Sequence, residues 1–440
     1  MSSKPRPSKP MSYRDRLQMV IPGGAHTYSR GADQFPANAP QILARGKGAY
    51  VYDDKGTRYL DYGMALRAVN IGYAEDEIDE AAMREIRKGN NLTRPSLIEL
   101  EAAELFTSLI DSADMVKFTK NGSTSVSAAV KLARAFTGRE LVARCAEHPF
   151  FSYDDWFIGS TILTRGVPRS AIEQTKLFRF NDIDSLRSLF ALHRGEVACV
   201  VLEPATVAHP EEGFLQAVQA ECRANGAVMI LDEMITGFRW HLKGAQHYYG
   251  VQPDLCTFGK AMANGFSVSC VAGRREVMEL GSIEFAGRER VFLLSTTHGA
   301  EMAGMGAFVA TVKYLEREPV VKHLWRYGQQ LIDLVNRLAK EFGVEQSLKA
   351  GGVPCSPYYA TLDRDGKPSL ELRTLLAQEM VRAGVLMPWI ALSYRHGDAE
   401  LALTDRALRA TLPVYRKGLE SGAQALLEGP AIKPVFRKFN

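Results

Sequence analysis

The sequence has no long hydrophobic run, few cysteines and no histidine cluster, and each absence excludes a class of protein. No apolar stretch reaches the roughly 18 to 20 residues that a membrane-spanning helix needs, so we expect no membrane contact. The six cysteines are scattered without a C-x-x-C pair, which is typical of reduced thiols in a cytoplasmic protein. The nine histidines show no metal-ligand spacing, so no metal site is predicted.

An excess of charge of one sign is also missing. The 54 basic and 50 acidic residues give a net charge of +4, which is too small on 440 residues to indicate a nucleic-acid partner. The first ten residues, MSSKPRPSKP, lack the apolar core of a signal peptide and are typical of a disordered leader. Hydrophobic residues make up 46% and charged residues 24%, the balance of a soluble globular protein.

The middle of the chain alternates short apolar runs with amphipathic segments. Strands are predicted at Met115–Phe118, Leu141–Cys145, Ala198–Leu202, Val228–Leu231, Leu255–Phe258 and Ser269–Ala272. Helices are predicted at Ser125–Phe136, Ile183–Leu192 and Leu215–Ala224. This alternation predicts an α/β fold with a large, mostly parallel sheet covered by helices on both faces.

Both ends of the chain have a different character. A strand–turn–strand hairpin is predicted over 48–61, and after residue 320 a long helix, Val320–Phe342, leads into a small α+β unit. That unit has predicted strands at Pro357–Leu362 and Val385–Leu386 and helices at Leu370–Ala383 and Thr404–Leu427. We therefore expect a large domain over 66–319 and a small domain built from 1–65 and 320–440.

Two charged residues follow two of the predicted strands. Asp232 comes directly after the strand Val228–Leu231, and Lys260 follows Leu255–Phe258 through a glycine. Ligands in open α/β sheets bind outside the carboxyl ends of the strands, so an acid and an amine at two such ends can share one cavity. Pyridoxal 5'-phosphate (PLP) uses such a pair, a lysine for a Schiff base and an aspartate for its ring nitrogen. Spacing alone does not establish this cofactor.

A family resemblance leads to the same cofactor. The segments LDEMITGFR and PDLCTFGKAMANGFSV resemble the cofactor region of class III (ω-type) aminotransferases of fold-type I. Within that class, IPGGAHTYSRG and the region from Gly46 onward are similar to glutamate-1-semialdehyde aminomutases. The similarity extends from about Ile21 to about Leu427. It implies a fold-type I, PLP-dependent transferase that acts on a small-molecule amino donor and a carbonyl acceptor.

The resemblance also implies roles for particular residues. Lys260 would carry the Schiff base and move the proton between substrate Cα and cofactor C4′, and Asp232 would keep the ring nitrogen protonated. The other implied cofactor contacts are Gly122 and Ser123 at the phosphate, Phe150 and Met234 on the two ring faces, Glu203 at the cofactor edge, and Thr296 reaching the phosphate of a second subunit. A homodimer with shared active sites is therefore expected.

Two arginines bear on the substrate. Arg30 aligns with the arginine that grips the substrate carboxylate in the aminomutases, and Arg67 stands where those enzymes have a small residue. Arginine binds carboxylates through a two-pronged fork, so an anionic or polyhydroxylated acceptor is expected. Aminotransfer between two molecules is the preferred interpretation. Intramolecular transfer by an aminomutase and a non-catalytic homologue remain alternatives. Leu66, Arg67, Phe151 and the loop 388–392, which lacks the acidic residue of the aminomutases, count against the mutase.

Overall fold

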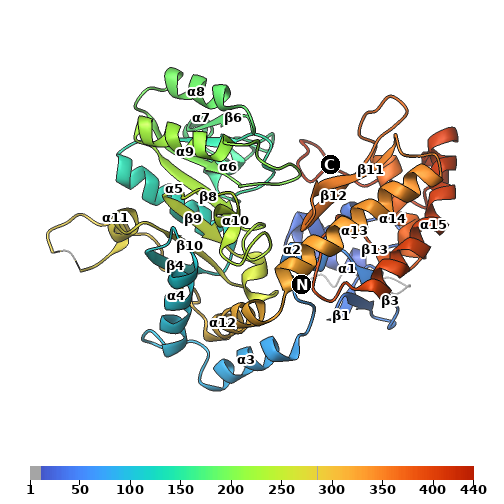
Figure 1. Ribbon diagram of the computed structural model, residues 1–440, viewed down its shortest axis with the longest axis horizontal. Helices are drawn as coiled ribbons and strands as arrows, with labels where there is room; N and C mark the ends of the chain where they lie inside the picture. The colour runs from blue at the N-terminus through green and yellow to red at the C-terminus, as the bar shows by residue number, and fades with distance from the viewer. Residues whose placement is uncertain (1–10, 285) are drawn as a thin grey trace, which may run out of the picture.

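A seven-stranded sheet organises the larger lobe of the protein, whose computed structural model describes residues 11–284 and 286–440 (Figure 1). The strand order is β4-β10-β9-β8-β7-β5-β6. The strands are β4 (Met115–Thr119), β5 (Leu141–Cys145), β6 (Thr175–Phe178), β7 (Val197–Leu202), β8 (Val228–Glu233), β9 (Leu255–Phe258) and β10 (Ser269–Gly273). Six of them point in the same direction, and β10 runs antiparallel to both of its neighbours. The expected large, mostly parallel sheet is confirmed.

Helices cover this sheet. They include α5 (Gly122–Thr137), α8 (Ile183–Leu192), α9 (Phe214–Asn225) and α12 (Met302–Arg317), with α3 (Asp76–Arg87), α4 (Leu97–Leu109) and the short α6 (Asp155–Ile158), α7 (Arg169–Glu173), α10 (Gly244–Tyr248) and α11 (Arg275–Met278) around them. The central strands β7, β8 and β9 are buried along their whole length. Such strands are typical of a parallel sheet with both faces covered.

Helix α12 was not predicted; it is buried on nearly all sides, so its amphipathic period is weaker than that of the predicted helix α13 (Val320–Glu341). It packs closely on α3 at Gly306. A Cβ added at Gly306 would lie 2.7 Å from the Cγ of Glu85. Strand β6 was also missed.

The smaller lobe combines both ends of the chain. Strands β1 (Leu43–Lys47), β2 (Tyr50–Asp53) and β3 (Arg58–Asp61) form an antiparallel meander, and β13 (Val385–Leu386) adds to β3 in parallel. Helices α13 (Val320–Glu341), α14 (Leu370–Arg382) and α15 (Asp398–Ser421) pack around it with the hairpin β11 (Leu348–Val353) and β12 (Ser356–Thr361) (Figure 1). Helix α1 (Tyr13–Val20) precedes them; the leader 1–10 lies outside the described residues.

The predicted bounds of α15 were wrong. The helix begins six residues before the predicted Thr404 and ends at Ser421 rather than Leu427. Its true start is marked by Glu400, whose side chain accepts the Gly397 N–H at 2.9 Å. Its end follows from Gly422, whose positive φ of 96° breaks the helix. Pro413 lies inside both the predicted and the observed helix.

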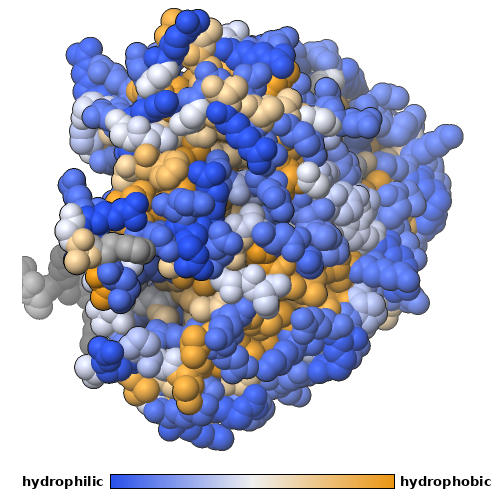
Figure 2. All heavy atoms as spheres, turned by 60° about the vertical axis from the view of Figure 1, so that its left-hand side comes forward, coloured by the Kyte–Doolittle hydropathy of each residue, from blue (hydrophilic) through white to orange (hydrophobic). Residues whose placement is uncertain are grey.

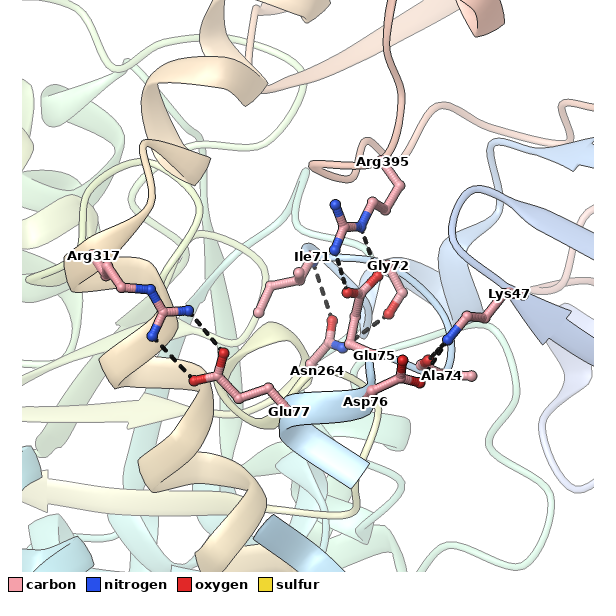
Figure 3. A network of polar contacts seen from close by, with 10 residues as sticks. All are labelled: Lys47, Ile71, Gly72, Ala74, Glu75, Asp76, Glu77, Asn264, Arg317 and Arg395. Atoms are coloured by element: carbon pink, nitrogen blue, oxygen red, sulfur yellow. Dashed lines mark hydrogen bonds and ion pairs between the residues drawn. The ribbon is translucent and has the colours of Figure 1, made fainter. Parts of the chain in front are cut away.

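A polar network ties the segment 71–75 to distant parts of the chain (Figure 3). Arg395 donates two hydrogen bonds to Glu75, at 2.9 and 2.6 Å. Asn264 accepts from the Ile71 N–H at 3.1 Å and donates to the Gly72 carbonyl at 2.9 Å. Since Asn264 lies four residues after Lys260, the lysine loop and the segment 71–75 are held together.

Candidate active site

Three ionisable side chains meet at the carboxyl edge of the large sheet. Asp232 is the second-to-last residue of β8. It pairs with Thr257 on β9, which lies three residues before Lys260. Glu203 directly follows β7, which pairs with β8 in parallel. Because neighbouring parallel strands end at the same edge, the fold brings Glu203, Asp232 and Lys260 together.

Of the two acids that end β8, only Asp232 keeps hydrogen-bonding capacity. Its Oδ1 accepts the Met234 N–H at 2.9 Å and the Thr257 hydroxyl at 3.3 Å, and no described group donates to Oδ2. The Glu233 carboxylate is surrounded by three donors, the Thr236 hydroxyl and the backbone N–H groups of Ala245 and Gln246. Glu233 is therefore structural, and Asp232 is the acid that can meet a ligand.

The charges at this edge are strongly coupled. Burial and the Asp232 carboxylate raise the pKa of Glu203 to about 8. Burial also raises the pKa of Asp232 to about 6, although the attraction of Lys260 works against it. Burial lowers the pKa of Lys260 below its ordinary value, and the two carboxylates oppose that change. The cluster thus favours a neutral lysine amine more than solvent does.

A cradle for an anion lies at the start of α5. Asn121 caps the helix by accepting the Thr124 N–H at 2.9 Å, so Gly122 and Ser123 lie within its first turn rather than before it, as the sequence suggested. No described acceptor takes their backbone N–H groups. The Ser123 side chain is buried, and its Oγ accepts the Tyr153 N–H at 3.2 Å. Free amides at a helix N-terminus bind phosphate.

Met234 fills the space between this cradle and the lysine. A Cβ added at Gly122 would lie 2.8 Å from the Met234 Sδ, and one added at Gly259 would lie 2.6 Å from the same atom. The same added Cβ at Gly259 would lie 2.5 Å from the Ser269 Oγ. Only glycine fits at these two positions, because a larger residue would displace the side chains that shape the cradle.

The segment Met64–Arg67 (α2) forms a left-handed turn. Its four φ angles are 38°, 48°, 63° and 68°, and none of the residues is glycine. Each such residue costs roughly 1–2 kcal/mol, because its Cβ approaches the following carbonyl oxygen. Left-handed turns of this kind persist only where surrounding contacts enforce them, and they cluster at functional sites.

The turn presents Arg67 beside the acidic cluster. Arg67 interacts electrostatically with both Glu203 and Lys260, and burial lowers its pKa. Its Nε is buried without a partner, and no described carboxylate forms an ion pair with it. Arg30 is exposed on the short helix 28–30, and its charge is felt at Tyr73, next to the turn.

A second buried arginine supports the turn. Arg239 is 1% exposed, and it donates to the Arg67 carbonyl at 3.1 Å and to the Leu392 carbonyl at 3.0 Å. Its Nε has no described partner, and burial lowers its pKa to about 10. Arg239 was not predicted as a site residue, although it lies within the LDEMITGFR segment. Two guanidinium groups without described carboxylate partners thus adjoin the cluster.

The remaining predicted residues differ in their setting. Phe150 is 48% exposed and packs edge-on against Phe157, with ring centroids 5.6 Å apart. Thr296 is exposed in the irregular segment that precedes α12. His148 was not predicted, although it is 1% exposed and its Nδ1 accepts the Glu203 N–H at 2.9 Å. Its Nε2 is buried without a described partner, so it is an N–H with an unused hydrogen-bonding capacity.

The residues at this edge fit PLP. Asp232 offers a buried acid for the ring nitrogen, Lys260 an amine, and the start of α5 an anion cradle that a Cβ at Gly122 would fill. Fold and site together define a fold-type I PLP-dependent transferase.

Comparison with known proteins places the chain within that class. The chain belongs to the class-III aminotransferase family, whose model, "Aminotransferase class-III", matches residues 32–357. The chain is 30% identical to a 3-aminobutyryl-CoA aminotransferase from Cloacimonas acidaminovorans, over 95% of this chain and 100% of the relative. It is 34% identical to a glutamate-1-semialdehyde 2,1-aminomutase from Alkaliphilus oremlandii, over 73% and 78%.

Solved structures agree with this assignment. The FumI protein of Sphingopyxis sp. MTA144, in its PLP internal aldimine form, superposes with a TM-score of 0.85 at 26% identity, covering 93% of this chain and 97% of that one. An omega-transaminase from Sphaerobacter thermophilus gives a TM-score of 0.81 at 27% identity, covering 92% and 97%. The protein is therefore a PLP-dependent enzyme, and the predicted class, fold, cofactor and aminotransferase activity are confirmed.

Two other findings bear on ligands. Among the residues described, no helix is long and apolar enough to cross a membrane. No group of three or more potential metal ligands occurs in the described part of the chain.

Proposed function

We propose that this enzyme transfers an amino group between two molecules and that its acceptor is anionic. The observation that carries this proposal is Arg67, which the left-handed turn places beside Glu203 and Lys260 without a carboxylate partner among the described residues. A guanidinium held in this way can bind a substrate carboxylate or phosphate through two parallel hydrogen bonds. Arg30 adds a second positive charge, whose electrostatic effect reaches Tyr73 next to the turn.

We also propose which residues hold the cofactor. Lys260 bonds to it, Asp232 faces its ring nitrogen, and the amides of Gly122 and Ser123 receive its phosphate. Met234, Phe150 and Glu203 line its ring faces and edge. When bound, PLP supplies a ring that withdraws electrons from the substrate α-carbon. Borohydride reduction should fix the cofactor to the wild type at Lys260 and leave Lys260→Ala unlabelled.

Lys260 then acts as the base. Because burial lowers the pKa of its amine, a neutral Nζ is available to take the proton from the substrate α-carbon and later return it. The carboxylate of Asp232 favours the protonated ring nitrogen, and Asp232 is itself fixed by Met234 and Thr257. The buried position of both groups strengthens these electrostatic effects.

Intramolecular transfer by an aminomutase is the second candidate, since Arg30 and the GGAHTYSRG segment resemble that group. The loop 388–392 speaks against it. Trp389 of this loop donates to the Gly63 carbonyl at 3.1 Å and so binds the loop to the Arg67 turn. Stoichiometry separates the two candidates, because a mutase isomerises one substrate and needs no second carbonyl compound.

We further propose a cytoplasmic homodimer. All six cysteines are free and buried, which suits a reducing compartment. Figure 2 shows hydrophobic side chains gathered in patches on the side of the molecule that carries α4 and α11. Leu97 of α4 is 88% exposed and Phe292 is 66% exposed. Large exposed hydrophobic side chains are typical of a surface that binds a second subunit.

The test is a screen of donors and acceptors that follows the conversion of the cofactor spectrum. The panel should include 3-aminobutyryl-CoA, glutamate-1-semialdehyde and simple keto acids with and without a second anionic group. We expect turnover with an anionic acceptor, and we expect Arg67→Ala to raise its KM roughly 10- to 150-fold. Arg326→Ala, at an exposed position on α13, is the matched control. An unchanged KM in Arg67→Ala would refute the proposal.

A further inference from the structure

The left-handed turn at Met64–Arg67 needs an external restraint, because none of its residues is glycine. Only glycine adopts positive φ without a steric penalty from Cβ. The residues on either side are ordinary: Gly63 has a φ of −79° and Ala68 a φ of −81°. The reversal of handedness is therefore confined to the residues that deliver Arg67.

Asp61 and Tyr73 form a clamp on this turn. Asp61, at the end of β3, accepts the Gly63 N–H at 2.7 Å and the Met64 N–H at 3.0 Å. The Tyr73 hydroxyl accepts the Ala65 N–H at 2.7 Å and donates to Asp61 Oδ2, the oxygen that also accepts the Met64 N–H, at 2.6 Å. Three consecutive backbone N–H groups are thus bound by two side chains that also bind each other.

Hydrogen bonds connect the clamp to other elements of the fold. Tyr73 exchanges two backbone hydrogen bonds with Gly48, at 2.8 and 2.9 Å. The two residues before Tyr73 are held by Asn264, and Glu75, two residues after it, is held by Arg395 (Figure 3). Since Asn264 belongs to the lysine loop, the clamp has a fixed position relative to Lys260.

We infer that Tyr73 and Asp61 are positioning residues that hold Arg67 in the orientation needed to bind the anionic group of the substrate. This inference rests on the proposed role of Arg67. Neither residue touches the reacting atoms; both act through the handedness of the turn. If the clamp loosens, residues 64–67 can return to right-handed or extended backbone, and the guanidinium leaves the cluster.

The first experiment is Tyr73→Phe, which keeps the ring and removes only the hydroxyl. We expect KM for the anionic acceptor to rise roughly 3- to 10-fold, the usual effect of a lost hydrogen bond, while kcat changes by less than about twofold. Tyr59→Phe is the matched control, because Tyr59 lies on β3 close to Asp61 and its hydroxyl makes no hydrogen bond within the described residues. A merely structural loss would not separate KM from kcat in this way.

The second experiment is rescue by glycine. Ala65→Gly removes the Cβ that opposes positive φ, so the double variant Tyr73→Phe/Ala65→Gly should recover a KM within about twofold of the wild type. Ala68→Gly makes the same chemical change three residues later, where the backbone is right-handed, and should give no rescue. In the wild-type background, Ala65→Gly should raise Tm and Ala68→Gly should lower it.

Two results would overturn the inference: equal KM values for Tyr73→Phe and the wild type, or no difference between Ala65→Gly and Ala68→Gly. A failure of the proposed function is distinguishable from these. If Arg67→Ala leaves KM unchanged, the proposed role of Arg67 is wrong. The clamp can still be tested without any substrate, by the Tm comparison and by hydrogen exchange of residues 63–69 in Tyr73→Phe. Faster exchange there supports it, and unchanged exchange contradicts it.

Discussion

Asp232 and Glu233 are adjacent buried acids, and their surroundings predict opposite mutational effects. Asp232→Asn should fold and bind cofactor but slow the half-reaction by at least about 100-fold, because the ring nitrogen loses its charged partner. Glu233→Gln should lower Tm, since the Glu233 carboxylate binds Thr236, Ala245 and Gln246, and should leave the rate within about threefold. Single-turnover spectra and thermal melts measure the two effects. A half-reaction in Asp232→Asn as fast as in the wild type would show that Asp232 has no role in the mechanism.

The raised pKa of Glu203 predicts how the cofactor-free protein responds to pH. Its pKa is about 8 in the fold against an ordinary value of 4.5, so the folded state holds the proton more tightly than the unfolded state. The resulting stability is complete below about pH 4.5 and is lost as pH rises through about 8. Glu203→Gln should therefore match the wild type at pH 5 and melt above it at pH 9. Thermal melts across this range test the prediction, and a constant Tm difference would contradict it.

At the scale of elements, the start of α5 depends on the absence of a side chain at Gly122. Gly122→Ala should push Met234 out of its place, because the new Cβ would lie 2.8 Å from its Sδ. We expect weaker cofactor binding, by roughly tenfold or more, measured by absorbance titration. Gly351→Ala in β11 is the control, since the nearest atom to its new Cβ, in Tyr358, is 3.8 Å away. Equal affinity in both variants would show that the cradle lies elsewhere.

Elements with a clear hydrophobic period could be predicted closely. Strands β5 and β9 and helix α8 have the expected bounds. Helix α12 could not be found, because burial on nearly all sides weakens the period. The left-handed turn could not be found either, because handedness leaves no repeat in the sequence and no glycine marks it.

Part of the candidate site could likewise be predicted from the sequence, and part could not. The placement of Asp232, Lys260 and Glu203 at one edge follows from strand ends and could be predicted. The support of the Arg67 turn could not, since Asp61, Tyr73 and Arg239 act on backbone N–H and C=O groups, which leave no pattern in the sequence. Such side chain to backbone contacts appear only once the chain is folded.

For the whole molecule, mixing two inactive variants tests whether Thr296 serves a second subunit. Lys260→Ala and Thr296→Arg should each be inactive alone. If Thr296 reaches the partner's cofactor, a mixed dimer has one intact site, and an equal mixture should recover roughly a quarter of wild-type activity. If Thr296 serves its own chain, both sites remain defective and no activity returns. Sedimentation should show at least a dimer throughout.

The pairing of β13 with β3 also has a consequence for biosynthesis. One edge of β3 stays unpaired until Val385 and Leu386 are synthesised, and these residues leave the ribosome long after Asp61. At roughly 5–20 residues per second, the interval of roughly 320 residues takes about 16 to 65 s. During that time the N-terminal meander exposes an unpaired strand edge, the kind of surface that templates aggregation. We therefore expect the nascent chain to aggregate most readily when translation pauses before residue 385 and to benefit from chaperones that cover strand edges.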